Sequence, residues 1–146
     1  MKITEIDLVK KLSRHLGRKG YDVFLEIPNM GQSADVVAQK GRWITITEVK
    51  LSNWTRALSQ CKNHEVIADY IYITVATKKV SERLVVEAER RGYGIIHYND
   101  KTQRFTILLK ASINRRIWKP QRKIFLKKLN TIKNAYSTLD DFWNVC

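Results

Sequence analysis

The chain of 146 residues is long enough for one ordinary domain with its own core, and its two cysteines, Cys61 and Cys146, form no CxxC pair. This spacing argues against a disulfide framework or a structural zinc site and favours a reducing compartment. The 27 Lys and Arg residues outnumber the 14 Asp and Glu residues and give a net charge of +13, which points to a polyanionic partner, with nucleic acid as the first candidate.

The N-terminal part predicts one helix and then three strands. Thr4 can cap a helix, because apolar side chains recur after it at helical spacing. Alternating apolar residues predict strands over residues 21–28, 34–40 and 42–50, with the last two forming a hairpin. No stretch has the apolar length of a signal peptide or a membrane span, so we expect no membrane association. The expected location is cytoplasmic, on the nucleoid or in the cytoplasm of a host cell.

The rest of the chain alternates helices and strands. The expected elements are helices over residues 54–67, 78–91 and 121–136, and strands over residues 69–77, 92–99 and 104–110. This order predicts an α/β fold, with a central mixed sheet of about five strands flanked by helices. We place the core at residues 1–110 and a basic helical extension, packed on the same domain, at residues 111–146.

Most of the excess positive charge lies in the C-terminal extension. Residues 1–100 carry 16 basic and 12 acidic side chains, whereas residues 101–146 carry 11 and 2. Four cations follow one face of the predicted helix: Lys119, Arg122, Lys123 and Lys127. Because such a stripe can follow a phosphate backbone, we predict that it contacts nucleic acid. Apolar residues at helical spacing are expected to pack against the body: Phe125, Leu129, Ile132 and Tyr136.

Three charged residues lie near one end of the predicted hairpin. Asp35 is near the start of its first strand, and Glu48 and Lys50 are near the end of its second. Side chains two residues apart share a face of a strand, so Glu48 and Lys50 point the same way. If the loop holds two residues (Lys40-Gly41) or four, Asp35 lies opposite Ile46 and shares this face, whereas a three-residue loop breaks the arrangement. Two carboxylates this close can share one hard cation.

The order of these elements resembles that of the PD-(D/E)xK nuclease superfamily, which has the restriction-endonuclease-like fold. The resemblance covers most of residues 1–98, from a helix with an early Glu to a strand ending in Glu48-Val49-Lys50. The Asp of the motif is Asp35, preceded by Ala where the superfamily often has Pro. In the following helix, Gln60 and His64 are similar to the Q-x-x-x-Y pattern of RecB-type and Holliday-junction-resolving nucleases, with His in place of Tyr.

The resemblance implies hydrolysis of phosphodiester bonds assisted by Mg²⁺, for which Mn²⁺ can substitute. Asp35 and Glu48 would hold the ion with the carbonyl of Val49, and the ion would polarise the scissile phosphate and activate a water molecule. Lys50 would position that water and neutralise charge that develops on the phosphoryl oxygens.

Further residues are predicted to take part in the site. Glu5 corresponds to an acid that many relatives carry on their first helix, although Asp7 is close enough to keep the choice open. Gln60 is expected to complete the catalytic group. Arg56 and His64 lie one helical turn on either side of Gln60, where we expect them to contact phosphate.

We therefore expect a Mg²⁺-dependent deoxyribonuclease that acts on duplex or branched DNA, an endonuclease with structure specificity or a role in repair or recombination. The preference for DNA over RNA, and for internal over terminal cleavage, follows from the superfamily. A homodimer and a partner protein that sets the target are further expectations. Two alternatives stay open. One is a nucleic-acid-binding module that retains the nuclease fold without cleaving, and the other is a metal-dependent hydrolase of a small phosphate ester.

Overall fold

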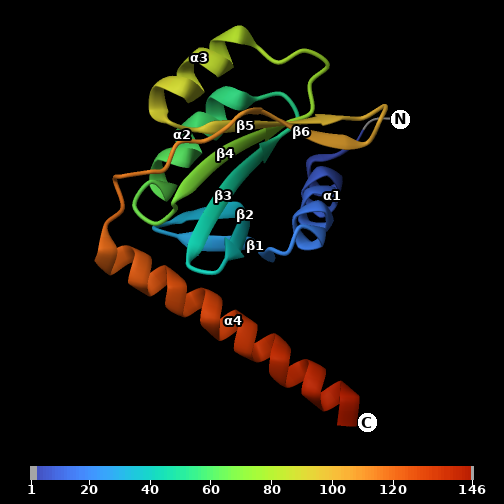
Figure 1. Ribbon diagram of the computed structural model, residues 1–146, viewed down its shortest axis with the longest axis vertical. Helices are drawn as coiled ribbons and strands as arrows, with labels where there is room; N and C mark the ends of the chain where they lie inside the picture. The colour runs from blue at the N-terminus through green and yellow to red at the C-terminus, as the bar shows by residue number, and fades with distance from the viewer. Residues whose placement is uncertain (1–2, 146) are drawn as a thin grey trace.

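A six-stranded mixed sheet forms the centre of the molecule (Figure 1). The computed structural model describes the backbone of residues 3–145 and the side chains of residues 3–135. The strands lie in the order in which they occur in the chain, and they are β1 (Asp22–Asn29), β2 (Gln32–Lys40), β3 (Trp43–Lys50), β4 (Tyr70–Val75), β5 (Gly94–Asn99) and β6 (Arg104–Leu109). The first three strands form an antiparallel meander, β3 to β5 are parallel, and β6 is antiparallel to β5.

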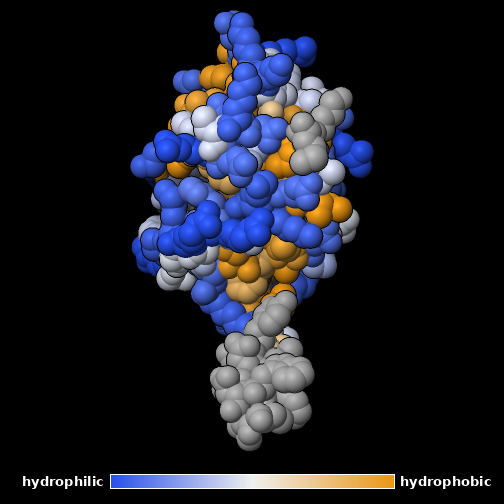
Figure 2. Space-filling view, turned by 90° about the vertical axis from the view of Figure 1, so that its right-hand side faces the viewer, coloured by the Kyte–Doolittle hydropathy of each residue, from blue (hydrophilic) through white to orange (hydrophobic). Residues whose placement is uncertain are grey.

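Helices cover both faces of this sheet. They are α1 (Glu5–Arg18), α2 (Trp54–His64), α3 (Glu82–Arg91) and α4 (Lys119–Val145). α2 and α3 are the crossovers that parallel strands require. On one face, Leu8 and Leu12 of α1 pack against Val36 and Val49. On the other face, α2, α3 and the start of α4 enclose the main core cluster. The side of the molecule that carries α1 has a mainly hydrophilic surface (Figure 2).

The predicted fold class is confirmed, with adjustments to individual elements. The sheet has six strands where about five were expected, because all six strands predicted along the chain belong to it, including β6 at its edge. α2 ends at His64 and α3 begins at Glu82, so both helices are shorter than predicted. α4 continues to Val145, beyond the predicted end at residue 136. α1 begins where it was expected, because the side chain of Thr4 accepts a hydrogen bond from the backbone N–H of Asp7 at 3.1 Å.

The start of α4 packs against the sheet. Phe125 and Leu129 are buried in the main core cluster and Ile132 packs against it, as the helical spacing predicts. The side chain of Tyr136 and the whole of Cys146 lie outside the described residues. No helix within residues 3–145 is both long enough and apolar enough to cross a membrane.

A buried ion pair joins α4 to the end of the sheet where β4 begins. The guanidinium of Arg122 lies 3.0 Å from a carboxylate oxygen of Asp69 and donates hydrogen bonds to the carbonyls of Ile67 and Arg42 at 2.7 and 2.8 Å. The same carboxylate oxygen accepts a hydrogen bond from the backbone N–H of Ile44 at 2.8 Å. This arrangement satisfies a buried acid with a permanent cation and a backbone donor.

Candidate active site

The hairpin of β2 and β3 has a different register from the predicted one. Its turn starts one residue later, at Gly41, whose φ of +60° suits the first central position of a type II′ turn. Ile46 therefore lies opposite Val37 and not opposite Asp35, so the predicted register was wrong. The shift is by two residues and preserves the alternation of faces. The last pair of this hairpin is Val36 with Thr47, so the next residues along the two strands, Asp35 and Glu48, lie beside each other.

The backbone of β2 turns at Asp35. Ala34 and Val36 are two residues apart, yet they belong to core clusters on different faces of the sheet. In the neighbouring strand, Glu26 has a φ of +52°, a left-handed conformation that is uncommon for a residue with a side chain. Such irregularities re-aim side chains near active sites. Here the carboxylate of Asp35 accepts a hydrogen bond from the backbone N–H of Val49 at 2.8 Å.

Asp35 and Glu48 interact electrostatically at this end of the sheet. Burial, followed by the neighbouring carboxyl of Glu48, raises the pKa of Asp35 to about 7. Glu48 is completely buried, and burial raises its pKa as well. The nearby ammonium of Lys50 acts in the opposite direction and lowers the pKa of both carboxyls. The two acids thus have less positive charge around them than two buried carboxylates require, a deficit that a divalent cation would remove.

A buried histidine orients Glu48. Nε2 of His64 lies 2.5 Å from Oε1 of Glu48, with both side chains at 0% exposure. Asn29 donates a hydrogen bond to the carbonyl of Asn63 at 2.9 Å and places the same nitrogen 3.5 Å from Nδ1 of His64. Because Nδ1 faces a donor, we assign the ring proton to Nε2, which donates it to Glu48. Burial lowers the pKa of His64 to about 4, in agreement with a neutral ring.

Three buried oxygens of this region have no hydrogen-bond donor among the described residues. They are Oε2 of Glu48, Oε1 of Gln60 and Oδ1 of Asn29. Gln60 lies one helical turn before His64, so both side chains lie on the face of α2 that is turned toward Glu48. A buried acceptor without a partner costs stability, which makes each such atom a candidate for binding a missing group.

The oxygen atoms of the site fit a hard divalent cation such as Mg²⁺. Asp35 and Glu48 would supply carboxylate oxygens, and Val49 lies between Glu48 and Lys50, where its carbonyl can serve as a further ligand. Within the part of the chain that the structure describes, no three or more His, Cys, Asp or Glu side chains come together as a metal cage. The ligand set therefore depends on the two carboxylates, with main-chain oxygen and water to complete the shell.

A cavity of about 280 Å³ lies between α1 and the sheet, with Asp35 and Val49 in its lining. Glu5 lines it from the helix, and its carboxylate accepts a hydrogen bond from the backbone N–H of Leu51 at 3.4 Å. Asp7 instead takes part in the cap of α1. Of the two acids that the sequence left open, the structure thus turns Glu5 toward the carboxylate pair.

Two residues of this region were not predicted from the sequence. Glu26 lines the same cavity, and Asn29 supports the buried histidine. Glu26 stands two residues after the buried Phe24, where alternation predicts another apolar residue, so this break in the pattern was a usable signal. The role of Asn29 depends on a contact with a distant helix and has no local signal.

The polar face of α2 becomes more buried along its length. Arg56 is exposed, Gln60 is half-buried and His64 is completely buried. The prediction that His64 contacts phosphate was therefore wrong, because the ring is enclosed between α2 and the sheet. Arg56 remains accessible, and its contact with phosphate stays a prediction.

The basic stripe on α4 keeps three of its four predicted members. Lys119, Lys123 and Lys127 are exposed, so their contact with nucleic acid stays a prediction. Arg122 is only 16% exposed and is paired with Asp69, so its assignment to the phosphate-binding stripe was wrong. Its guanidinium holds the helix to the body.

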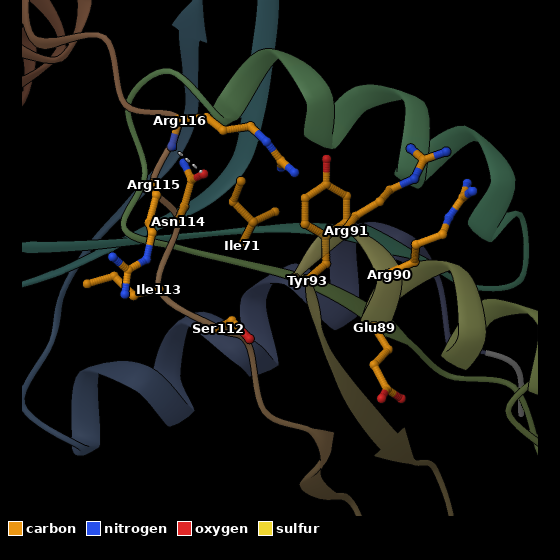
Figure 3. A pocket seen from close by; sticks show the side chains of 11 residues that line it. Ile71, Glu89, Arg90, Arg91, Tyr93, Ser112, Ile113, Asn114, Arg115 and Arg116 are labelled. Carbon is orange, nitrogen blue, oxygen red and sulfur yellow. Dashed lines mark hydrogen bonds between the residues drawn. The ribbon is translucent and has the colours of Figure 1, made fainter.

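A second pocket, of about 290 Å³, lies between the end of α3 and the segment that follows β6 (Figure 3). Four arginines line it: Arg90, Arg91, Arg115 and Arg116. Three of them have acidic partners, since Arg90 and Arg91 lie 2.9 and 3.7 Å from Glu87, and Arg116 lies 3.4 Å from Glu65. Because Arg90 and Arg91 share one acid, two carboxylates balance part of the charge of the four arginines in this arginine pocket.

The sequence matches no family model and no curated protein. Solved structures resemble its fold. SPO1766, a protein of unknown function from Silicibacter pomeroyi, superposes with a TM-score of 0.68 at 18% identity, over 97% of this chain and 93% of that one. AF1548, another protein of unknown function, gives a TM-score of 0.54 at 19% identity, over 64% of this chain and 59% of that one.

An XisH family protein from Nostoc punctiforme superposes with a TM-score of 0.52 at 13% identity, over 71% of this chain and 98% of that one. The XisH family has a restriction-endonuclease-like fold. At these identities the similarity concerns the fold alone.

Proposed function

We propose that the protein is a metal-dependent nuclease of the PD-(D/E)xK superfamily that hydrolyses phosphodiester bonds in DNA. The observation that carries the proposal is the carboxyl pair at the end of the hairpin. Glu48 keeps one buried oxygen without a donor, and its proximity contributes to a pKa of about 7 for Asp35. Perturbed carboxyls beside a cavity are typical of a functional site. The restriction-endonuclease-like fold of a structural neighbour supports the same assignment.

Each residue of the site has a distinct task in this proposal. Asp35, Glu48 and the carbonyl of Val49 hold Mg²⁺, which when bound polarises the scissile phosphate and lowers the pKa of a water ligand. Lys50 neutralises charge that develops on the phosphoryl oxygens. His64 holds one oxygen of Glu48 in place, so that the second oxygen is free to bind the metal ion. Hydrogen bonds of this kind commonly orient the ligands of metal sites.

The charge of the protein favours a polymeric substrate. A net charge of +13 is unnecessary for a hydrolase of a small phosphate ester, whereas it attracts nucleic acid over long distances. The intact Asp35, Glu48 and Lys50 favour cleavage over binding alone, because a module that only binds has no use for a buried carboxyl pair.

The test is cleavage of supercoiled plasmid and branched DNA with Mg²⁺, Mn²⁺ or EDTA. We expect nicking or linearisation with either metal and none with EDTA. Asp35→Asn and Glu48→Gln should abolish cleavage, and Lys50→Ala should lower its rate by about a hundredfold or more, because each removes charge from the reacting centre. Glu89→Gln is the matched control, since Glu89 is an exposed acid that lines the arginine pocket and not the cavity at Asp35.

Calorimetry with Mn²⁺ separates the roles of the three residues. Asp35→Asn and Glu48→Gln should lose metal binding, while Lys50→Ala should retain it. Full cleavage by either carboxyl variant would refute the site assignment. A wild-type protein that binds DNA but cleaves none of these substrates with either metal would be the non-cleaving binding module.

A further inference from the structure

A groove lined by cations runs along the outer side of α1. Its volume is about 690 Å³, and it lies between α1 and the turn that joins β5 to β6. Four cationic side chains line it: Lys11, Arg14 and Arg18 from the helix, and Arg104 from the start of β6. The remaining lining residues are His15, Gln103 and Phe105, so no carboxylate lines the groove.

These cations differ from most of those in the arginine pocket in forming no ion pair, although the pKa of Asp7, which hydrogen bonds with Thr4 lower, is lowered further by the nearby Lys11. The ion pairs found among the described residues involve none of the four. Within residues 3–135, whose side chains the structure describes, the one hydrogen bond from these four side chains is from Nζ of Lys11 to Gln103 at 3.4 Å. The positive charge of the α1 groove is thus available to an external anion, and the surrounding surface is mainly hydrophilic (Figure 2).

The spacing of the cations suits a phosphate backbone. Lys11, Arg14 and Arg18 lie along one side of α1, and seven helical residues span roughly 10.5 Å. Phosphates of one DNA strand advance by about 3.4 Å each along the duplex axis, but the strand winds around that axis, so neighbouring phosphates lie farther apart and this length corresponds to about two of them. Arg104 faces the helix from the other wall. A short run of phosphates can therefore lie between the two elements.

The groove offers little surface on which bases could stack. The aromatic residue Phe105 is half-buried. Its ring centroid lies 4.9 Å from that of Tyr98 and 5.1 Å from that of His15. The Phe105 ring therefore already packs against two other rings and is not free to stack on a base. Binding in the groove thus uses the backbone and not the bases, which predicts little dependence on sequence.

The same helix borders the carboxyl pair. Glu5 and Val9 line the cavity in front of Asp35, whereas Lys11 and Arg18 line the groove. With Leu8 and Leu12 facing the sheet, these two sets lie on opposite flanks of α1. A duplex held along the groove therefore lies against the helix that forms one wall of the cavity.

We infer that the α1 groove is the main binding surface for the phosphate backbone of duplex DNA. This inference rests on the proposed function for the identity of the polymer, and it adds the surface that holds it. The groove binds the backbone without reading sequence, and selection of a cleavage point occurs elsewhere.

The test compares two quadruple variants with the same change in net charge. The groove variant changes Lys11, Arg14, Arg18 and Arg104 to Gln, and the control changes Arg90, Arg91, Arg115 and Arg116 to Gln. Exposed ion pairs contribute little stability, so the control should fold, and thermal melting checks both variants. Affinity for a labelled duplex of mixed sequence is measured by fluorescence anisotropy in EDTA over a range of salt concentrations.

We expect the slope of log K against log salt to fall by about 3 to 4 in the groove variant, because each lost phosphate contact removes close to one released counterion. The control should lose less than about two units of slope, because two acids neutralise part of its charge. An unchanged slope in the groove variant, or an equal loss in both variants, would overturn the inference. If the groove variant folds poorly, the double variant Arg14→Glu/Arg18→Glu replaces it in this test. The double variant should bind DNA more weakly than the wild type.

Binding in EDTA also separates this inference from the proposed function. If Glu48→Gln still cleaves while the groove variant loses its salt slope, the metal site is wrong and the groove is right. If Glu48→Gln abolishes cleavage and the groove variant binds like the wild type, the metal site stands and the groove fails.

Discussion

Glu48 and Asp69 are both buried acids beside the same sheet, and their surroundings are opposite. Asp69 lies at the end where β4 begins, and it is paired with the guanidinium of Arg122 and accepts a backbone N–H. Glu48 lies near the other end of the sheet, where its contact is a neutral histidine and its second oxygen has no donor. The fold therefore satisfies one buried acid completely and leaves the other incomplete.

This difference separates a structural charge from a functional one. A buried ion pair with all its hydrogen bonds fixes the position of α4 and needs no ligand. A buried carboxyl pair with too little positive charge costs stability in the free protein, and a bound cation recovers that cost. The contrast leads to predictions for stability and for DNA binding.

The largest change in stability is expected at the Asp69 end. Arg122→Ala leaves a buried carboxylate without its cation and should lower the free energy of unfolding by about 3 kcal/mol. Glu48→Gln removes a charge that has no cationic partner, so in EDTA its free energy of unfolding should equal that of the wild type or exceed it. Urea denaturation monitored by circular dichroism measures both.

Arg116→Ala serves as the control for Arg122→Ala. Arg116 is 59% exposed and 3.4 Å from Glu65, and such exposed pairs contribute about 1 kcal/mol or less. A loss of about 2 kcal/mol or more in Glu48→Gln would contradict the comparison, because it would make Glu48 and His64 a structural ion pair.

The sequence predicted the order of the elements well, and the site only in part. Local patterns were sufficient for the capped first helix and for the strands, because capping and alternation depend on neighbouring residues. The proximity of Asp35 and Glu48 was also predicted, since a register shift by two residues keeps the faces unchanged. The backbone irregularity at Glu26, which accompanies the turn of Asp35, depends on a left-handed conformation that the sequence did not reveal.

Roles that depend on distant contacts were missed. Arg122 has the same helical spacing as its lysine neighbours, and only its approach to Asp69 distinguishes it. His64 continues the polar face of α2, and only the sheet beneath it makes it buried. Charge patterns along a helix thus identify candidate contacts without showing which cations the fold itself uses.

A smaller effect is expected from the titration of Asp35. In EDTA, its raised pKa of about 7 means that the folded protein binds a proton between about pH 4 and pH 7 that the unfolded chain has released. This contribution makes the free energy of unfolding fall as pH rises through that range. The lowered pKa of His64, about 4, acts in the opposite direction from about pH 4 to about pH 6.5.

Comparison with Asp35→Asn tests the contribution of Asp35 together with its influence on the pKa values of His64 and Glu48. The stability of Asp35→Asn relative to the wild type should increase as pH rises from about 4 to about 7, and it should be constant above pH 8. Mg²⁺ should stabilise the wild type at pH 8 and leave the variant unchanged. A relative stability that does not change with pH would show that Asp35 titrates normally.

The smallest effect is expected from the basic stripe of α4. Lys119, Lys123 and Lys127 are exposed on the helix that packs against the main core cluster, on the opposite face of the sheet from α1. A duplex held in the α1 groove does not lie along this stripe.

Changing the three lysines to Gln removes at most three phosphate contacts, so the salt slope should fall by less than about 2.7, and by less than in the groove variant. A control on the same helix is Lys133→Gln, which removes one charge and whose side chain pairs with Asp22 at 3.1 Å. A loss as large as that of the groove variant would contradict the groove as the main binding surface, because equal numbers of released counterions imply equal numbers of neutralised phosphates.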